Sequence, residues 1–129
     1  MTSPVPKDNS VQRLNVEPRY SDMAIFRGVA YLAGQVPHDA NADASGQTAQ
    51  VLQTIDGLLA QAGSHRSLLL MATVYLADMA DYDAMNTVWD AWMVGIEAPP
   101  RATVEARLAR SGWKIEIVVT AAVPGSVST

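Results

Sequence analysis

Two stretches of this sequence have the hydrophobic period of an amphipathic helix, and they constrain the fold more than any other feature. Between residues 45 and 62 the apolar side chains recur at helical spacing, and Gly63 follows as a helix C-cap. A second stripe covers residues 85–93, after Asp81, which can cap the start of that helix. Because each helix has one apolar face, the pattern predicts that both helices cover the same side of a sheet.

Six shorter runs have the composition of β-strands, and their order predicts an α+β fold. They cover residues 11–16, 22–28, 29–37, 68–78, 102–109 and 114–123. The second and third runs meet at Arg27–Gly28, and residues 110–113 join the last two, so both pairs are predicted to form hairpins. The order β-β-β-α-β-α-β-β predicts a two-layer sandwich, with two helices on one face of a mixed sheet. The domain is expected over residues 11–123, between a flexible segment at 1–10 and a tail at 124–129.

The last predicted strand is apolar on both of its faces. Ile115, Ile117 and Val119 alternate onto one face, whereas Val118 and Ala122 lie on the other. The two helices can cover only one face of the sheet. The second apolar face is therefore expected to be buried by another subunit.

The composition suits one globular domain and excludes several kinds of site. The chain has 129 residues, of which 49% are hydrophobic and 17% are charged. It contains no cysteine, which excludes disulfides, thiolate metal ligands and cysteine nucleophiles. His38 and His65 lie in polar segments without a matching carboxylate or thiol cluster, so no metal site is expected.

Charge and hydropathy also limit the partners of the chain. The net charge is −4, and the nine Lys and Arg residues are scattered rather than grouped. Because nucleic-acid binders usually have a basic face, nucleic acid is not an expected partner. No apolar run approaches the roughly 20 residues of a membrane helix, and the N-terminus lacks the features of a secretion signal. We therefore expect a cytoplasmic protein without membrane contact.

Two charged residues in the C-terminal part of the chain, Arg101 and Glu116, are candidates for a functional site. Arg101 follows two prolines at the start of a strand, where its planar guanidinium could bind a small carboxylate through two hydrogen bonds. Glu116 interrupts an apolar strand, and it could exchange protons with a substrate if it lines a pocket. Spacing alone favours the ordinary interpretations, which are a surface arginine for Arg101 and an ion pair for Glu116.

The hairpin predicted at the end of the chain gives these residues a register. Symmetric closure of the 110–113 loop places Arg107 opposite Glu116, so the two would form a cross-strand ion pair. Arg101 would then lie about 20 Å from that point along the strand. A small substrate cannot span this distance. A site that uses both Arg101 and Glu116 would therefore combine residues of different subunits.

Several single residues have both a functional and an ordinary interpretation. Tyr20 could supply an aromatic wall, or it could be a packing residue. Gly34 could leave room for a ligand at the main chain, or it could ease a turn. Asn86 could be an exposed helix residue. Ser111 has no evident base, so a hydrolase triad is not supported.

Three separated motifs resemble those of the RidA (YjgF) family. In PPRATVEARLARSGWKIEI, Glu116 follows Arg101 by fifteen residues, which is the separation in the family's C-terminal signature. LAGQVP resembles the family's Ser-Gly-Gln-Ile-Pro element, and Tyr20 precedes Gly34 by fourteen residues, the family's usual spacing. The resemblance covers roughly residues 17–123 and looks most like a short YoaB-like branch.

The resemblance implies a chorismate-mutase-like fold, a homotrimer and three clefts between subunits. It also implies hydrolysis, without a cofactor, of enamines and imines such as 2-aminoacrylate to 2-keto acids and ammonia. Carried onto this chain, Arg101 would hold the substrate carboxylate, and Glu116 would activate water and move protons. Gly34 would contribute main-chain hydrogen bonds, and Tyr20 would line the pocket. Asn86 matches an asparagine near the cleft of some members.

Two residues depart from the family pattern at positions that would line the pocket. Ala33 stands where many members have serine, which removes a hydroxyl. Thr103 stands where many have cysteine, which excludes thiol-based regulation. An alternative function is non-catalytic binding of small carboxylates, such as 2-keto acids, in the same cleft. Some relatives are described as ribonucleases, but the acidic charge balance argues against that activity here.

Overall fold

The spacing of apolar residues changes along the chain between a helical and a strand period, and the helices and strands occur where these periods predict them. A computed structural model describes residues 10–125, so the predicted segments at 1–10 and 124–129 lie mostly outside the described residues. The elements are β1 (Gln12–Val16), β2 (Ser21–Phe26), β3 (Val29–Leu32), α1 (Ala44–Gln61), η2 (Arg66–Leu68), β4 (Leu69–Leu76), η3 (Met79–Asp81), α2 (Tyr82–Trp92), β5 (Arg101–Glu105) and β6 (Ile115–Ala122).

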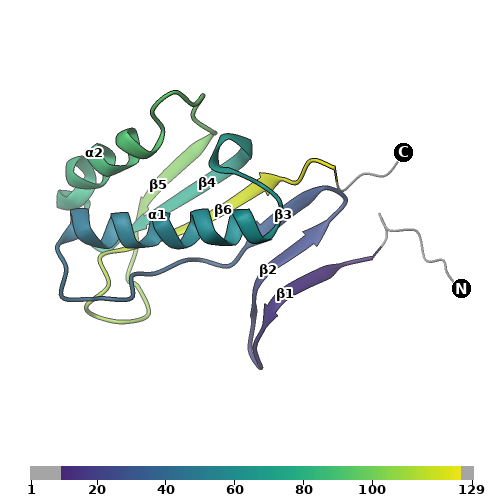
Figure 1. Ribbon diagram of the computed structural model, residues 1–129. Helices are drawn as coiled ribbons and strands as arrows, with labels where there is room; N and C mark the ends of the chain where they lie inside the picture. Colours follow the sequence, from purple (N-terminus) through teal and green to yellow (C-terminus); the bar gives the residue numbers. More distant parts are fainter. Residues whose placement is uncertain (1–9, 126–129) are drawn as a thin grey trace, which may run out of the picture.

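The strands form one mixed sheet, and both α-helices lie on the same face of it (Figure 1). The order across the sheet is β1-β2-β3-β6-β4-β5. β4 and β5 are parallel, and the other neighbours are antiparallel. The predicted α+β class, the mixed sheet and the placement of the two helices on one face are confirmed.

The core lies between the helices and this face of the sheet. The apolar stripe of α1 packs against alternate residues of the central strands, and α2 adds its own stripe at the β4–β5 end. Its most fully buried large side chains are Met23, Val51, Leu52, Ile55, Leu59, Val74, Leu76, Met85, Ile115, Ile117 and Val119. The helical period of residues 45–62 and 85–93 therefore identified the buried faces correctly.

Local signals set the two ends of α1. The Asp43 carboxylate accepts a hydrogen bond from the backbone N–H of Gly46 at 2.8 Å and caps the helix start. At the other end, Gly63 directly follows the C-cap residue Ala62 and has a φ of 79°, a left-handed conformation that suits glycine. Gly63 thus ends the helix as expected, one position beyond the cap itself.

The first hairpin is confirmed, and the predicted cap of the second helix is only half correct. Arg27 and Gly28 have φ values of 52° and 78°, the two positive values that a tight turn between β2 and β3 requires. β3 ends at Leu32, earlier than the predicted run to residue 37. Asp81 does precede α2, but its side chain forms no capping hydrogen bond.

The hairpin predicted at the end of the chain is wrong. β5 pairs with β4 in parallel, and β6 lies between β3 and β4 rather than beside β5. The physical reason is burial. β6 is apolar on nearly all positions and takes a central place, whereas β5, with Arg101 and Glu105, lies at the edge. The connection from β4 through α2 to β5 is the crossover that a parallel pair needs.

This topology also removes the predicted ion pair between Arg107 and Glu116. The residue opposite Glu116 is Tyr75 of β4, and Arg107 lies in the exposed connection after β5. Among the described residues, neither Arg107 nor Glu116 forms an ion pair. Glu116 is therefore free of the structural role that spacing alone had favoured.

The face of the sheet that points away from the helices is called the open face below. It presents side chains of the central strands that are half-buried or exposed: Val29, Tyr31, Thr73, Tyr75, Glu116, Val118 and Thr120. Most of these side chains are apolar or aromatic. Neither helix covers them within the described chain, so burial of this face by another subunit stays a prediction.

Candidate functional site

Glu116 and Gly34 lie against each other at the open face. Gln35 forms two backbone hydrogen bonds with Ile117, at 2.9 and 3.0 Å, which fix the segment after β3 beside β6. Gly34 is then so close to Glu116 that a Cβ on the glycine would overlap the carboxylate. The carboxylate thus occupies the space that any other residue at position 34 would fill. Position 34 therefore requires glycine because a side chain has no space there, and not because of the backbone conformation.

Tyr75 is a further residue of this cluster that the sequence did not indicate. It is directly opposite Glu116 in the β4–β6 ladder, so both side chains point to the open face. Tyr75 is half-buried on the same face as Glu116, whose carboxylate lies against Gly34. Only the pairing of β4 with β6 reveals this neighbour, and the predicted hairpin placed a different strand there.

Arg101 begins β5 and points to the helix face of the sheet. Its partner in the parallel ladder is Ala72, which is fully buried beneath the helices. The guanidinium carbon lies 5.1 Å from the ring centroid of Trp89, and Nη1 lies 3.7 Å from the sulfur of Met85. Among the described residues no carboxylate pairs with this guanidinium. Most of its N–H donors are therefore available to an external anion.

Thr103 follows Arg101 on the same face of β5. Its hydroxyl oxygen is buried and has no hydrogen-bond partner among the described residues. A buried polar atom of this kind usually costs stability unless something else satisfies it. Asn86, the residue after Met85 on α2, is half-buried and forms no side-chain hydrogen bond within the described chain. Thr103 thus offers a polar group on the same face as Arg101, and Asn86 is next in sequence to Met85, which Arg101 contacts.

Arg101 and Glu116 do not meet within one chain. β4 lies between their strands, and the two residues are offset by three positions along it, since their partners on β4 are Ala72 and Tyr75. Their Cα atoms are therefore about 14 Å apart, nearer than the predicted hairpin implied. However, their side chains point to opposite faces of the sheet. The conclusion that one chain cannot unite them stands, for a different geometric reason.

Two other predicted pocket residues, Tyr20 and Ala33, directly precede β2 and directly follow β3, respectively. Tyr20, in the turn between β1 and β2, is 60% exposed, and its backbone carbonyl accepts a hydrogen bond from Glu17 at 2.7 Å. Ala33 is half-buried, and its backbone N–H donates to the carbonyl of Asp22 at 2.8 Å. Ala33 directly precedes Gly34 in the sequence, so it lies next to the residue that contacts Glu116. Tyr20 is exposed at the β1–β2 turn.

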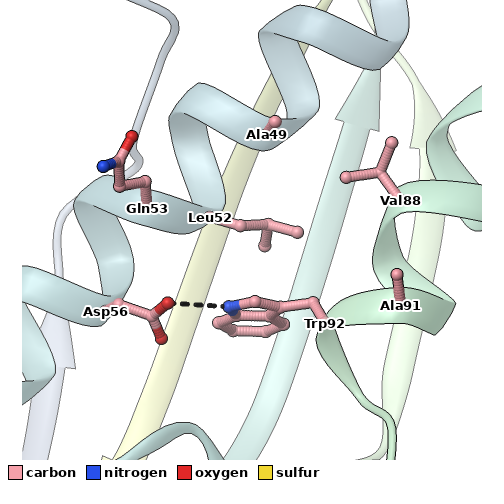
Figure 2. Close-up of a pocket in the computed structure, with 7 residues that line it drawn as sticks. All are labelled: Ala49, Leu52, Gln53, Asp56, Val88, Ala91 and Trp92. Atoms are coloured by element: carbon pink, nitrogen blue, oxygen red, sulfur yellow. Dashed lines mark hydrogen bonds between the residues drawn. The ribbon is translucent and has the colours of Figure 1, made fainter.

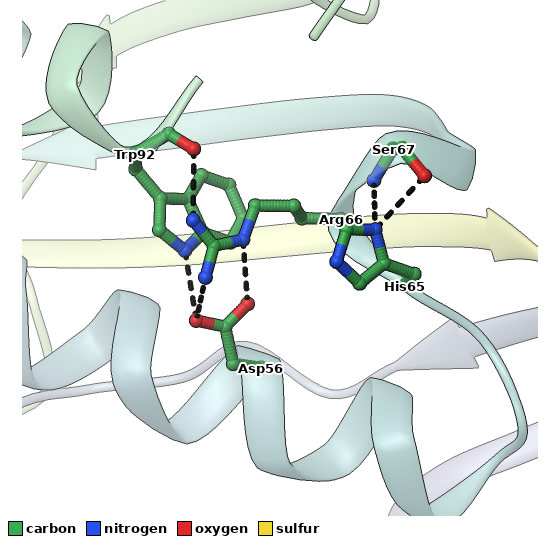
Figure 3. Close-up of polar contacts among 5 residues, drawn as sticks. All are labelled: Asp56, His65, Arg66, Ser67 and Trp92. Atoms are coloured by element: carbon green, nitrogen blue, oxygen red, sulfur yellow. Dashed lines mark hydrogen bonds and ion pairs between the residues drawn. The ribbon is translucent and has the colours of Figure 1, made fainter. Parts of the chain in front are cut away.

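A shallow pocket of about 300 Å³ between α1 and α2 contains none of the predicted residues. Its lining consists of Ala49, Leu52, Gln53, Asp56, Val88, Ala91 and Trp92. Figure 2 shows the hydrogen bond that the indole N–H of Trp92 donates to Asp56. Asp56 is also the partner of Arg66, so the charged group of the pocket is already engaged (Figure 3). This pocket has no free chemical group that would make it a catalytic centre.

The described residues contain no group of three or more His, Cys, Asp and Glu side chains that could hold a metal ion. His65, drawn in Figure 3, uses Nδ1 to accept a hydrogen bond from the backbone N–H of Ser67 at 3.1 Å. Neither described α-helix has the length and hydropathy to cross a bilayer.

Comparison with known proteins places the chain among relatives of similar length. The model of the Endoribonuclease L-PSP family matches residues 10–123. A RutC family protein of Haemophilus ducreyi is 55% identical over 113 residues, which are 88% of this chain and 97% of that protein. The RutC family protein YoaB of Escherichia coli is 45% identical over 114 residues, with 88% and 99% of the two chains covered.

Solved structures agree with these sequence comparisons. The structure of NMB1025 from Neisseria meningitidis, described as a member of the YjgF protein family, superimposes with a TM-score of 0.86. It is 44% identical to this chain, and the match covers 89% of this chain and 96% of that one.

Proposed function

Because this chain belongs to the RutC/YjgF/RidA (L-PSP) family, we propose that it hydrolyses small imines and enamines that carry a carboxylate. The substrates would be 2-aminoacrylate and other small 2-imino acids, and the products 2-keto acids and ammonia. One observation carries the proposal most directly: the carboxylate of Glu116 lies against Gly34 with no cation paired to it among the described residues. A carboxylate held at a glycine without a structural partner is suited to proton transfer.

The reaction needs only groups that this chain supplies. Water adds to the C=N carbon of the imine, the nitrogen gains protons, and the C–N bond breaks to leave a C=O group and ammonia. Glu116 takes a proton from the attacking water and returns protons to the leaving nitrogen. Arg101 pairs with the substrate carboxylate and orients the C=N group relative to that water.

The position of β5 at the sheet edge supports carboxylate binding by Arg101. Backbone groups of Pro100 and Ala106 bond to β4, at 3.0 and 2.9 Å. Because strand residues alternate, the backbone N–H groups of Arg101 and Thr103 point away from β4, towards the free edge. An anion at this edge could accept hydrogen bonds from the guanidinium and from these backbone groups together. The buried Thr103 hydroxyl would then lie beside the bound substrate.

The proposed site requires assembly of the chain. Arg101 faces the helix side and Glu116 faces the open side of one sheet, so each must meet its counterpart from another subunit. The apolar open face gives the chain a surface that assembly would bury. A homotrimer, with a cleft at each of three subunit boundaries, meets both requirements and is part of the proposal. Tyr20, Gly34, Ala33 and Asn86 would line these clefts.

A coupled assay tests the proposal. An enzyme that forms 2-aminoacrylate from serine would supply the substrate, and the release of pyruvate and ammonia would be followed with and without this protein. The wild-type protein should accelerate release above the spontaneous rate. Arg101→Ala and Glu116→Gln should each remove that acceleration, and an unchanged rate in Arg101→Ala would refute the assignment. If the wild-type protein binds 2-ketobutyrate but accelerates nothing, it is a carboxylate binder instead.

A further inference from the structure

The guanidinium of Arg101 rests on an aromatic ring rather than on an acid. Its carbon lies 5.1 Å from the centroid of the Trp89 ring, and Nη1 reaches the sulfur of Met85 at 3.7 Å. Both contacts come from α2 and are attractive without neutralising the charge. A guanidinium held over an aromatic face keeps its edge donors available for a carboxylate, whereas a glutamate partner would consume them.

Trp89 is itself fixed in place by a second tryptophan. The Trp89 side chain is 5% exposed, and its ring centroid is 5.5 Å from that of Trp92, with the planes inclined at 55°. This inclined arrangement is one of the favourable geometries for aromatic pairs. Movement of the Trp89 ring would therefore disturb both Arg101 on one side and Trp92 on the other.

Trp92 is in turn held by Asp56 of α1 and by Arg66 of η2 (Figure 3). Its indole N–H donates to Asp56 at 3.0 Å, and its backbone carbonyl accepts a hydrogen bond from Arg66 Nη1 at 3.0 Å. Arg66 also forms two hydrogen bonds with Asp56, at 3.1 and 2.8 Å, and its guanidinium carbon lies 5.2 Å from the centroid of the Trp92 ring. The indole of Trp92 is thus held by its hydrogen bond to Asp56, by the guanidinium of Arg66 and by the ring of Trp89.

We propose that Trp89 is the positioning residue for Arg101 and that it holds the guanidinium in the orientation that receives the substrate carboxylate. This inference rests on the proposed function of Arg101. The Asp56–Arg66–Trp92 cluster stiffens Trp89 from behind, so contacts continue from α1 through α2 to the first residue of β5. A long arginine side chain that is ordered before binding loses less conformational freedom when the substrate arrives.

The two substitutions that test this role are Trp89→Phe and Trp89→Met. Both remove volume from the core, but phenylalanine keeps a ring for the guanidinium to rest on, and methionine does not. In a Trp89 variant Arg101 can still reach the same bound geometry and orient the C=N group, but a smaller fraction of the free protein has the guanidinium ready to bind. The loss of its orientation should therefore raise KM and leave kcat nearly unchanged. We expect KM within about threefold of wild type for Trp89→Phe and about tenfold higher for Trp89→Met.

A nuclear magnetic resonance measurement tests the contact without any substrate. The Nε–H signal of Arg101, assigned by its loss in Arg101→Lys, should be shifted upfield by the Trp89 ring current in the wild-type protein. The shift should be lost in Trp89→Met, while the signal of Arg66 over Trp92 persists. Val88→Ala, on the same helix, controls for general loosening of α2 and should leave the Arg101 signal and KM unchanged. An unshifted Arg101 signal in the wild-type protein would overturn the inference, whatever the turnover.

Failure of the proposed function can be separated from failure of this inference. If no imine is turned over but 2-ketobutyrate binds, deamination is refuted, and the affinities of the two Trp89 variants for 2-ketobutyrate decide the role of Trp89. Equal affinity, or equal KM, in Trp89→Phe and Trp89→Met would overturn the positioning role even if the signal shift is present. If the wild-type protein neither binds nor turns over a carboxylate, both the function and the positioning role are refuted.

Discussion

At the scale of single residues, the structure explains why position 34 is occupied by glycine, which the sequence alone could not explain. The sequence suggested a glycine that leaves room for a ligand or eases a turn, whereas the structure shows the carboxylate of Glu116 in the space beside it. The same closeness depends on the bridge between Gln35 and Ile117, which joins residues far apart in the chain. Tyr75 was missed for the same reason, because only strand pairing places it opposite Glu116.

Gly34→Ala should displace the Glu116 carboxylate and reduce kcat by about 100-fold, since misplacement of a reacting group by 1 Å can have that effect. The fold should survive, because the side chain of Glu116 can turn towards solvent. The control is Gly57→Ala, where an added Cβ on α1 meets nothing within 4 Å. That variant should keep full activity and gain up to about 1 kcal/mol of unfolding free energy. Full activity in Gly34→Ala would show that the position of the carboxylate is unimportant.

Thr103→Val separates a structural from a functional role for the buried hydroxyl. Because this oxygen has no partner among the described residues, its removal should leave the free energy of unfolding unchanged or raise it by about 1 kcal/mol. If the hydroxyl contacts the substrate in the proposed cleft, KM should rise at the same time. Urea unfolding and the imine assay measure the two effects. A loss of more than about 1 kcal/mol would mean that the hydroxyl has a partner in the folded protein.

At the scale of elements, sequence patterns correctly predicted the features that depend on residues close together in the chain. The apolar stripes located α1 and α2, and Arg27–Gly28 located the first hairpin, because these features depend on neighbouring residues. The arrangement of the last strands could not be read this way. β5 and β6 are consecutive in the sequence, yet β4 separates them, since a strand with two apolar faces is more stable at the centre of the sheet.

The loop between β5 and β6 is held by the buried side chain of Gln47, which no sequence motif predicted. Gln47 of α1 is fully buried, and its Nε2 lies 3.1–3.2 Å from the carbonyls of Ala40, Ala42 and Gly112. Its Oε1 accepts a hydrogen bond from the backbone N–H of Lys114 at 2.8 Å. Gln47 therefore fixes the chain two residues before Glu116.

Gln47→Met should lower the free energy of unfolding by about 2–4 kcal/mol, because several buried backbone groups lose their partner. Methionine has a similar length, so the loss of hydrogen bonds dominates over the change in packing. Gln53→Met, on an exposed position of the same helix, should change it by less than about 0.5 kcal/mol. Equal urea midpoints for the two variants would contradict the role assigned to Gln47.

At the scale of the whole molecule, the account depends on assembly. The helices cover one face of the sheet (Figure 1). The open face presents apolar side chains such as Tyr31 and Val118. Because Arg101 and Glu116 lie on opposite faces, an isolated chain would contain the two halves of the proposed site without uniting them. The sequence also predicted that one chain cannot unite the two residues, but it did so from an incorrect hairpin. Only the strand order shows that they lie on opposite faces of the sheet.

Val118→Glu should dissociate the assembly and abolish imine hydrolysis, although both proposed catalytic residues are intact. A charge in the middle of the open face would be buried without a partner in the oligomer. Val94→Glu is the matched control, because Val94 follows α2 and is 77% exposed. It should leave the mass in solution and the activity unchanged. Light scattering measures the mass, and an active Val118→Glu monomer would show that the site does not need a second subunit.

Mixing two inactive variants shows whether each active site combines residues of two subunits. Arg101→Ala and Glu116→Gln should each be inactive alone, and the two should be unfolded together, refolded and shown by native mass spectrometry to form mixed oligomers. If each site combines Arg101 of one subunit with Glu116 of its neighbour, random mixing in a ring restores about one quarter of the sites. The account predicts recovery of about a quarter of wild-type activity. Mixed oligomers without any recovered activity would contradict it.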